Sequence, residues 1–467
     1  MTDTRALRPT VLVVGGGAAG ALTALHLARE ATSEVEVVVI DPAVRLAAGT
    51  AFSTTDPDHL LNVPASGMSA LPDEPGHFAQ WRSRTTGAEV DPHEFAPRRE
   101  WGRYLAETLD ASVRGSRVTL RHVRATATSV DRAGTGVLVG LDDGRRLAGD
   151  ALVVGTGLPA PSPSWAPEAM RASDRFVVDP WAPGALARVD EDPGRLPDVL
   201  VVGTGLTMVD VVTTLARRPD RFLHAVSRSG RLPRRHADGP QAPVVPDVTQ
   251  WGHDLASIAD HTHAHLREAE IATGDWRPGL DGLRHRVQDL WGRLDERDRL
   301  AFLARYAAAW NRIRHRVPGP SAQRIDGLTA AGRLTTSAAR VTGAEAVADG
   351  LRVTLEDGTV REVGWVVNCT GPDLDVRDLG DPLVDGLLES GLATCATAGM
   401  GFRTRDGRLL DATGTVGAPV WVLGALRRGE LWESTAVPEI RVQAAAAATA
   451  VLTTIAPSPT LTEGIPR

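Results

Sequence analysis

The chain has 467 residues, which is enough for two or three domains with well-buried cores. Its composition, with 42% hydrophobic and 23% charged residues, is that of a globular protein, and its net charge of −7 argues against a nucleic-acid partner. No lysine is present and all 51 basic residues are arginine, which excludes lysine nucleophiles and Schiff bases.

The cysteines and the first residues exclude two further classes of protein. Cys369 and Cys395 stand far apart without a CxxC pair, so a redox-active dithiol is not expected. Met1–Pro9 has no apolar signal-peptide core, and no apolar run approaches the length that spans a membrane. We therefore expect a cytoplasmic protein without a membrane partner.

A short apolar strand that runs into glycines and then into a helix-like segment occurs twice. Val11–Val14 leads into Gly15–Gly20, and Val199–Val202 leads into Gly203–Met208. Such a turn lets backbone N–H groups approach a pyrophosphate at a helix N-terminus. The predicted cofactor contacts are Gly15, Gly17, Ala18 and Gly20 in the first copy, and Gly203, Gly205 and Thr207 in the second.

A second repeat follows each glycine motif at a constant offset. Residues 136–157 and 350–371 each read as a hairpin with an Asp-Gly turn and a buried strand ending in Thr-Gly (350 − 136 = 214 and 371 − 157 = 214). Each glycine motif therefore opens a module that such a strand closes, and Gly157 is a further cofactor candidate. The sequence predicts an α/β fold with two Rossmann-like dinucleotide-binding domains.

The order of these signals predicts a discontinuous outer domain with a second domain inserted in it. We predict residues 1–160 and 372–467 as the two parts of the outer domain and residues 161–371 as the inserted one. Helical spacing over 284–316 indicates a helical insertion at about 235–325. A strand ending at Gly424 and a helix over Val437–Ile455, with Pro438 in its first turn, are expected near the end.

The residue that ends the second strand of each module indicates which nucleotide binds. Asp41 follows Val35–Ile40, and a carboxylate there accepts hydrogen bonds from a ribose diol and repels a 2′-phosphate, which suits FAD. Ser227 and Arg228 end the corresponding strand of the second module, and a hydroxyl beside a guanidinium suits the 2′-phosphate of NADPH. The alternative is that Arg228 is simply a surface residue. Met208 replaces the third glycine and suggests a slightly splayed helix.

This order of motifs resembles the flavoproteins with two dinucleotide-binding domains, in which the outer domain holds FAD and the inserted one NADPH. Several stretches look like the bacterial FAD/NAD(P)-binding family: Gly49–Ser53, His59–Ala65, Gly67–Ser69, Asp179–Trp181, Arg314–Arg316 and Gly429–Arg441. That family is similar to flavin-dependent N-hydroxylating monooxygenases. The resemblance implies an FAD-dependent oxidoreductase that uses NADPH and molecular oxygen to hydroxylate a small amine or amino acid.

The chain departs from related flavoproteins at two places. Gly424 is followed by Ala425, where relatives usually have an aspartate that binds the flavin ribityl chain, so Glu430 or Glu433 is a candidate substitute. Glu433 and Thr435 lie just upstream of the predicted helix whose positive end we expect to face the flavin pyrimidine, and they could contact the flavin ring or ribityl chain. The alternative is that this stretch is an ordinary capping turn. Residues 176–181 lack the glycine and histidine of Baeyer–Villiger oxygenases, which makes ketone oxygenation a minority interpretation.

Two residues are candidates for catalysis. Asn62 lies in an apolar loop that could cover the flavin, and its side chain needs a partner, either the cofactor or the backbone of its own loop. His315, within Arg314–Arg316, could help to hold a substrate carboxylate or the nicotinamide phosphates, unless this segment is a solvated basic helix end. His261, His263 and His265 resemble a metal cluster, but only the first and last share a helical face, so no metal site is predicted.

Two other functions fit the same motifs. The protein could be an FAD/NADPH reductase or dehydrogenase that passes electrons to a partner without oxygenation. It could also be a nucleotide-binding sensor that keeps the fold without catalysis, which the missing aspartate after Gly424 leaves open.

Overall fold

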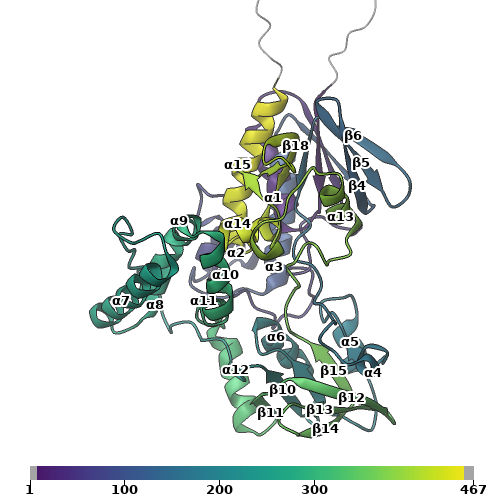
Figure 1. Cartoon of the computed structure of the whole chain (residues 1–467), viewed down its shortest axis with the longest axis vertical. Coiled ribbons are helices and arrows are strands. Elements are labelled where there is room, and N and C mark those ends of the chain that lie inside the picture. Colours follow the sequence, from purple (N-terminus) through teal and green to yellow (C-terminus); the bar gives the residue numbers. More distant parts are fainter. Residues whose placement is uncertain (1–7, 457–467) are drawn as a thin grey trace, which may run out of the picture.

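The computed structural model describes residues 8–456. Figure 1 shows two lobes, one built around α1 and α15 and the other around β9–β11 and β15, with a group of helices projecting at their side. Each lobe contains a mainly parallel sheet covered on both faces, as expected for dinucleotide-binding modules.

The first lobe is built on a seven-stranded sheet in the order β16-β17-β18-β7-β1-β2-β3. Its strands are β1 (Thr10–Val14), β2 (Val35–Ile40), β3 (Val118–Val123), β7 (Ala151–Val154), β16 (Thr404–Arg405), β17 (Arg408–Leu410) and β18 (Val416–Val422). Strand β7 pairs with β1 in parallel, and β18 pairs with β7, so the end of the chain completes the sheet begun by its start. This confirms the predicted discontinuous outer domain.

Helices cover one face of this sheet. They are α1 (Ala18–Glu30), α2 (His77–Thr86), α3 (Arg98–Arg114) and α15 (Val437–Ile455), with the short η1 (Ala65–Gly67) beside them. Helix α15 has the predicted bounds, and its apolar residues pack against α1 in one core. The opposite face packs against α13 (Pro382–Glu389) and a small antiparallel sheet.

The second lobe has a five-stranded sheet in the order β11-β10-β9-β15-β8. Its strands are β8 (Phe176–Val177), β9 (Val199–Val202), β10 (Leu223–Ser227), β11 (Leu334–Ala338) and β15 (Trp365–Asn368), all parallel to their neighbours. Three helices share its core on one face, α5 (Ala185–Asp190), α6 (Leu206–Leu215) and α12 (Gly319–Ala330). On the other face lie α4 (Glu168–Arg171) and a second antiparallel sheet.

The two antiparallel sheets are the predicted repeats. The first consists of β4 (Ala127–Ala133), β5 (Gly136–Leu141) and β6 (Arg146–Gly149), and the second of β12 (Val341–Val347), β13 (Gly350–Leu355) and β14 (Val360–Val363). Each leads directly into the strand that lies beside the opening strand of its module, β7 beside β1 and β15 beside β9. The predicted hairpins and closing strands are therefore confirmed.

The group of helices at the side is the helical insertion. It contains α7 (Leu255–Thr273), α8 (Arg277–Leu283), η2 (Arg284–Arg286), α9 (Val287–Arg293), α10 (Glu296–Arg305) and α11 (Ala307–Arg314). Its core also takes in Trp432, next to α14 (Arg428–Leu431) in the first lobe. The remaining short helices are η3 (Thr397–Gly399) and η4 (Gly424–Arg427). Within the predicted 235–325 segment, helix therefore starts at Leu255, and α12 belongs to the layers of the second lobe.

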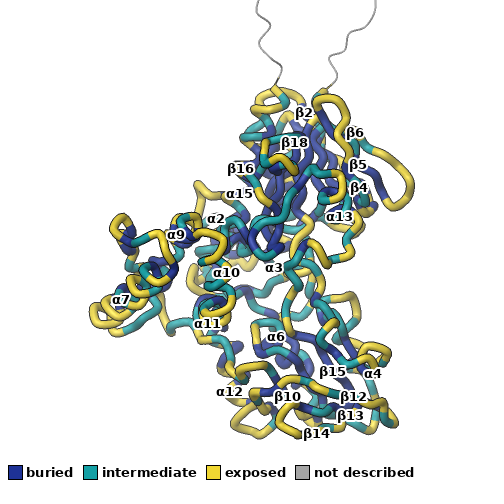
Figure 2. The backbone as a smooth tube through the Cα atoms, viewed as in Figure 1, coloured by how far each residue is buried: buried dark blue, intermediate teal, exposed yellow. Residues whose placement is uncertain are grey.

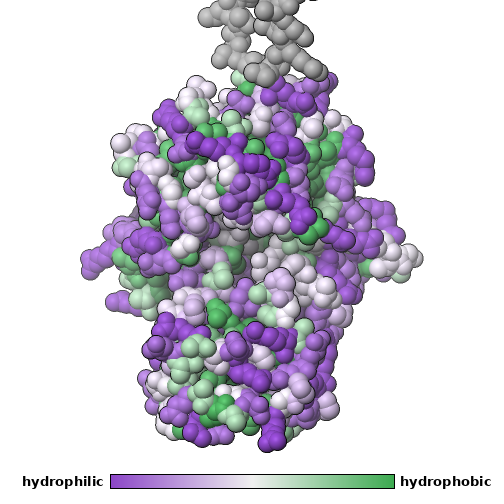
Figure 3. All heavy atoms as spheres, turned by 90° about the vertical axis from the view of Figure 1, so that its right-hand side faces the viewer, coloured by the Kyte–Doolittle hydropathy of each residue, from purple (hydrophilic) through white to green (hydrophobic). Residues whose placement is uncertain are grey.

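Burial follows this arrangement. The interior strands of both lobes are buried, and exposed residues lie on the loops and outer helix faces (Figure 2). On the side turned away from the helical insertion, hydrophilic side chains cover most of the surface and apolar ones are scattered (Figure 3). Between residues 8 and 456, none of the helices combines the length and the hydropathy needed to cross a membrane.

Candidate functional site

The first glycine turn is shaped by close backbone contacts. Gly15 has φ +93°, and a Cβ there would lie 2.4 Å from the carbonyl oxygen of Gly155 at the end of β7. A Cβ on Gly20 would lie 1.8 Å from the Gly15 oxygen, so α1 packs too closely against the turn to admit a side chain at this position. Gly17 is the N-cap of α1, and no side chain of the described residues caps it. The free N–H groups of this first turn can therefore bind an anion.

Asp41 lies beside this turn, as its place after β2 predicts. One carboxylate oxygen accepts a hydrogen bond from the Gly16 N–H at 2.5 Å, and the other accepts one from Ala43 at 2.8 Å. Gly49, in one of the family-like stretches, approaches Gly17 so closely that a Cβ on it would lie 2.9 Å from the Gly17 Cα. The glycine turn, the β2 carboxylate and the 49–53 loop thus meet at the carboxyl edge of the first sheet.

The second glycine turn repeats this geometry with one change. Gly203 has φ +113°, and a Cβ there would lie 2.1 Å from the carbonyl oxygen of Cys369 at the end of β15. Gly205 is the N-cap of α6, again without a capping side chain among residues 8–456. Met208 is fully buried in the core of the lobe, so α6 leaves room for a side chain where α1 leaves none. Thr207 lies in the first turn of α6.

Polar groups surround the end of β10. The Ser227 hydroxyl is 2.8 Å from that of Thr204 and accepts a hydrogen bond from the Gly230 N–H at 3.0 Å. Arg228 is exposed. A nearby cavity of about 720 Å³ reaches from Val209 on α6 to α12. Its cationic side chains, which the sequence did not single out, are Arg231, Arg234, Arg235, Arg277 and Arg312.

The loop between the family-like stretches Gly49–Ser53 and His59–Ala65 holds α6 in place. Asp56 accepts hydrogen bonds from Arg217 at 2.5 Å and from Thr214 at 2.6 Å. Burial opposes ionisation of Asp56, but the Arg217 and Thr214 hydrogen bonds outweigh it and lower the pKa of this carboxyl. The two lobes are therefore joined by charged contacts.

Two buried side chains strengthen this junction. Arg98, at the start of α3, donates to Asp210 of α6 at 2.9 Å, and the Asp210 side chain is only 6% exposed. Burial raises the pKa of Asp210, although Arg98 counteracts the shift. His59 is likewise buried and lies 2.8 Å from the Thr214 hydroxyl. His59 and Trp181 come from two family-like stretches and meet edge to face at 5.6 Å.

The predicted residues Glu433 and His315 are brought together by the helical insertion. Glu433 accepts a hydrogen bond from the indole of Trp310 at 2.7 Å, and the Arg314 guanidinium lies 3.6 Å away. Burial raises the pKa of Glu433, but the charges of Arg314 and His315 and the Trp310 hydrogen bond more than reverse this. Burial lowers the pKa of His315, and Arg314 adds to the effect while Glu433 opposes it.

This cluster rules out one alternative for the Arg314–Arg316 segment. Arg314 is 6% exposed and Arg316 5%, so the segment is not a solvated helix end. Arg316 pairs with Asp281, whereas Arg314 lies 3.6 Å from Glu439 in the first turn of α15. The insertion therefore contacts the start of α15, the helix predicted to face the flavin.

The end of β18 is tied to α15 through one glutamine. The Gly424 N–H donates to the side-chain oxygen of Gln443 at 3.0 Å, and the Gln443 amide donates to the Ser434 carbonyl at 3.1 Å. The Ser434 hydroxyl is buried and finds no hydrogen-bond partner within residues 8–456. Thr435 is half-buried beside it. Glu430 instead binds Thr404 and Arg427, so its carboxylate is already engaged.

Asn62 contacts the segment between β10 and α7. Its backbone carbonyl accepts a hydrogen bond from His236 at 3.1 Å, and its side chain bonds to no other described residue. Of the two partners considered for this side chain, its own loop backbone is therefore not the one observed. Burial lowers the pKa of His236 to about 4, and the charge of Arg316 contributes, so that this ring is a neutral hydrogen-bond partner at neutral pH.

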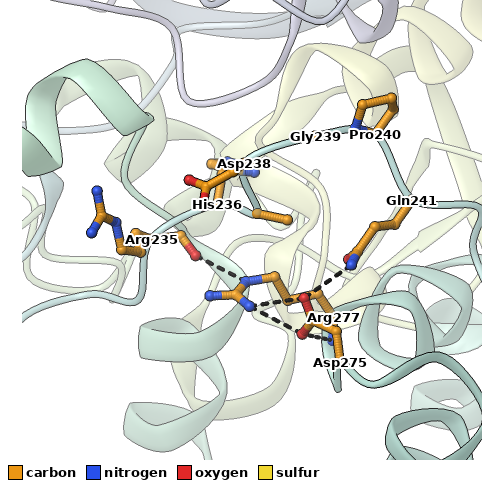
Figure 4. A pocket seen from close by; sticks show the side chains of 9 residues that line it. Arg235, His236, Asp238, Gly239, Pro240, Gln241, Asp275 and Arg277 are labelled. Carbon is orange, nitrogen blue, oxygen red and sulfur yellow. Dashed lines mark hydrogen bonds and ion pairs between the residues drawn. The ribbon is translucent and has the colours of Figure 1, made fainter.

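A polar cavity of about 380 Å³ adjoins His236 (Figure 4). Arg277 lies at its centre and donates to Asp275 and to the Arg235 carbonyl, and Gln241 also donates to Asp275. Arg277, Asp275 and Gln241 are therefore engaged with one another, whereas Asp238 has no partner among the residues drawn.

The three clustered histidines diverge. His261 bonds the Ser257 carbonyl, His265 bonds that of Gly279, and His263 lines an apolar pocket. Across the described part of the chain, no three His, Cys, Asp or Glu side chains are placed to hold a metal.

Comparison with known proteins agrees with this architecture. Residues 12–159 match a family model described as FAD-NAD(P)-binding. No curated protein matches the chain.

Solved structures match over nearly the whole length. An ornithine N-hydroxylase from Kutzneria sp. 744, in a structure with reduced FAD, NADP⁺ and L-ornithine, is 18% identical with a TM-score of 0.61, covering 95% of this chain and 99% of that one. L-Lysine 6-monooxygenase from Pseudomonas syringae is 19% identical with a TM-score of 0.63 over 95% and 99%. The cadaverine monooxygenase DfoA from Erwinia amylovora, bound to FAD, is 14% identical with a TM-score of 0.63 over 95% and 94%. Residues 12–159 therefore match an FAD-NAD(P)-binding family, and the chain shares the two-domain fold of these solved monooxygenases.

Proposed function

We propose that the protein is an FAD-dependent monooxygenase that uses NADPH and molecular oxygen to hydroxylate the nitrogen of a small amine or amino acid. The net reaction would be R–NH₂ + O₂ + NADPH + H⁺ → R–NHOH + H₂O + NADP⁺. The observation that carries the proposal is the pair of glycine cradles at the carboxyl edges of two sheets, whose lobes are joined by Arg98–Asp210 and Asp56–Arg217. A cytoplasmic location belongs to the same proposal, since both cysteines stand as thiols.

The residues of the first lobe fit FAD. The uncapped first turn of α1 offers N–H groups to a pyrophosphate, and Asp41 offers a carboxylate to the adenosine ribose. The buried, unpartnered hydroxyl of Ser434 offers a hydrogen bond beside Thr435 and the first turn of α15. The proposed FAD contacts are Gly15, Gly17, Ala18, Gly20, Asp41, Gly157, Gly424, Glu433 and Thr435.

The residues of the second lobe fit NADPH. Gly205 and Thr207 lie at the uncapped N-terminus of α6, where N–H groups can bind a pyrophosphate. Ser227 and the exposed Arg228 follow β10, next to a cavity lined by further arginines, which suits a nucleotide with an additional phosphate. The proposed NADPH contacts are Gly203, Gly205, Thr207, Ser227 and Arg228.

When bound, FAD would supply the hydride acceptor and the activation of oxygen. The chain would supply position and electrostatics. Asn62 would hydrogen-bond the flavin or the substrate through its free side chain. His315, kept neutral by burial, would accept or donate a proton at the substrate nitrogen, with Glu433 beside it to stabilise the protonated ring.

The test is an assay of the FAD-loaded protein with NADPH under air and a panel of amines and amino acids. We expect at least one compound to accelerate NADPH consumption and to yield a hydroxylamine in proportion to the NADPH oxidised. Hydrogen peroxide as the sole oxygen product with every compound, together with rapid reduction of an artificial acceptor, would instead assign the protein to the reductases.

A further inference from the structure

The helical insertion contains a half-open apolar pocket that the proposed function does not yet use. It lies between α7, α9, α10 and α11 and has a volume of about 160 Å³. Its walls include Leu266, Leu290, Trp291, Phe302, Tyr306 and Trp432. His263 and the phenol of Tyr306 are the only ionisable groups among the residues that line it.

Trp432, which joins this pocket to the first lobe, has two unusual features. Its backbone has φ +60° and ψ −61°, a conformation that costs free energy for a residue with a side chain. Its side chain is 95% buried, and its indole N–H finds no acceptor among residues 8–456. Buried donors are rarely left unpaired, and strained residues cluster where ligands bind, so Trp432 points to a bound molecule in the pocket.

Trp432 is held in this position by its neighbours. Its ring stacks on Trp291 at 5.4 Å, and Trp291 donates a hydrogen bond to the Gly429 carbonyl at 3.0 Å. The residue that follows is Glu433, whose carboxylate binds the Trp310 indole, and Trp310 also lines the pocket. Trp310 is therefore shared between the wall of the apolar pocket and the Glu433–His315 cluster proposed to act on the substrate nitrogen.

Arg428 supplies a charge at the same place. Its guanidinium lies 4.9 Å from the Trp432 ring, and it forms neither an ion pair nor a hydrogen bond with any described residue. Burial lowers the pKa of Arg428, with Glu433 opposing the shift. Arg284 and Arg316, by contrast, each pair with a carboxylate. Arg428 is therefore a cation without a carboxylate partner among the described residues, held against Trp432, which is one of the pocket walls.

We infer that the pocket binds the side chain of an apolar amino acid, aromatic or branched aliphatic, whose carboxylate lies against Arg428. The inference rests on the proposed function and narrows its substrate class. A cavity of about 150 Å³ holds one benzene ring, which matches this volume. A polar, charged side-chain terminus, such as that of ornithine or lysine, would find no carboxylate among the lining residues.

Calorimetric titration of the FAD-loaded protein with L-phenylalanine, L-leucine, 2-phenylethylamine and L-ornithine tests the inference. We expect the two apolar amino acids to bind at least about tenfold more tightly than ornithine, because burial of such a side chain contributes that much or more. We also expect 2-phenylethylamine to bind about tenfold more weakly than phenylalanine, since it lacks the carboxylate. Equal binding of all four compounds, or binding of ornithine alone, would overturn the inference.

Single substitutions in and beside the pocket test whether the amino acid binds there. Ala259→Trp fills the pocket from α7 and should weaken phenylalanine binding at least about tenfold. Ala256→Trp places the same side chain on the same helix at an exposed position outside the pocket and should leave binding unchanged. Arg428→Met should remove the preference for phenylalanine over 2-phenylethylamine. If Ala259→Trp, shown to be folded by its thermal transition, binds phenylalanine normally, the pocket is not the site.

The inference and the proposed function fail in different ways. If NADPH and oxygen convert ornithine but no apolar amino acid, the monooxygenase stands and the pocket assignment is wrong. If phenylalanine binds and Ala259→Trp abolishes this binding, but no compound yields a hydroxylamine, the pocket assignment stands and the monooxygenase proposal is wrong.

Discussion

The glycine turns of the two lobes can be compared residue by residue. In both, the first glycine has a positive φ and faces the carbonyl that ends the closing strand, Gly155 in one lobe and Cys369 in the other. They differ at the third position, where Gly20 packs against the turn and Met208 fills a core. They differ again after the second strand, where one has a carboxylate and the other an exposed arginine. The strand and turn thus define the module, and a few side chains define what it binds.

The largest effect is expected from Gly20→Ala. Its Cβ would overlap the backbone oxygen of Gly15 at 1.8 Å, and backbone cannot give way as a side chain can. We expect a loss of more than about 4 kcal/mol in the free energy of unfolding and loss of bound flavin. Met208→Ala removes a buried side chain without any overlap and should cost about 3 kcal/mol. Denaturant unfolding and flavin content check the pair, and equal losses would contradict the difference between the turns.

The second prediction concerns the charged contact at the junction of the two lobes. Arg98→Ala leaves Asp210 buried without its cation and should reduce the free energy of unfolding by about 3 kcal/mol at pH 7. Burial holds the pKa of Asp210 above its unfolded value, so the folded state binds the proton more readily. The deficit of Arg98→Ala should therefore shrink as the pH falls from 7 towards 5. Arg99→Ala, at the exposed neighbouring position, is the control and should change stability by less than about 0.5 kcal/mol.

The third prediction concerns the ends of the second strands. Arg228→Ala should raise the KM for NADPH about tenfold and leave that for NADH unchanged, since only the former carries the phosphate that the guanidinium would bind. Asp41→Ala should instead raise the dissociation constant of FAD about tenfold, with little change in the KM for NADPH. Steady-state kinetics and flavin titration measure the two effects. An equal effect of Arg228→Ala on the KM values of both coenzymes would show that Arg228 does not bind the 2′-phosphate and is simply a surface residue.

The smallest effect on the fold is expected from Asn62→Ala. The side chain bonds to no other described residue, so the free energy of unfolding should stay within about 0.5 kcal/mol of the unmodified protein. The rate of substrate-dependent NADPH oxidation should nevertheless fall about fivefold. Unfolding and turnover are measured on the same variant. An unchanged turnover rate would show that Asn62 does not contribute to catalysis.

Local sequence patterns were sufficient for the elements of both lobes. Periodicity, turn residues and a first-turn proline predict the glycine turns, the repeat at an offset of 214 residues and the bounds of α15. All three signals act over a few neighbouring residues. The helices at 284–316 were also predicted, whereas the start of helix at Leu255 and the role of α12 in the second lobe were not. Membership of a core layer depends on packing partners that periodicity does not name.

The contacts between segments were largely missed. Arg98 and Asp210 are 112 residues apart, and Trp310 and Glu433 are 123 apart, so no local pattern links them. Arg428 was not singled out, because an arginine near a helix looks like a surface charge until its burial is known. Resemblance to a family did mark His59, Trp181 and Arg314, but the reason for their presence is visible only in the folded chain.

The carbonyl contacts behind both glycine turns have a consequence for affinity. The carbonyl groups of Gly155 and Cys369, at the ends of sheet strands, hold the two glycine turns in one conformation. The entropy cost of ordering each anion-binding loop is therefore part of folding and not of ligand binding. A dinucleotide then meets a preorganised receptor, and its binding free energy is not diminished by loop closure.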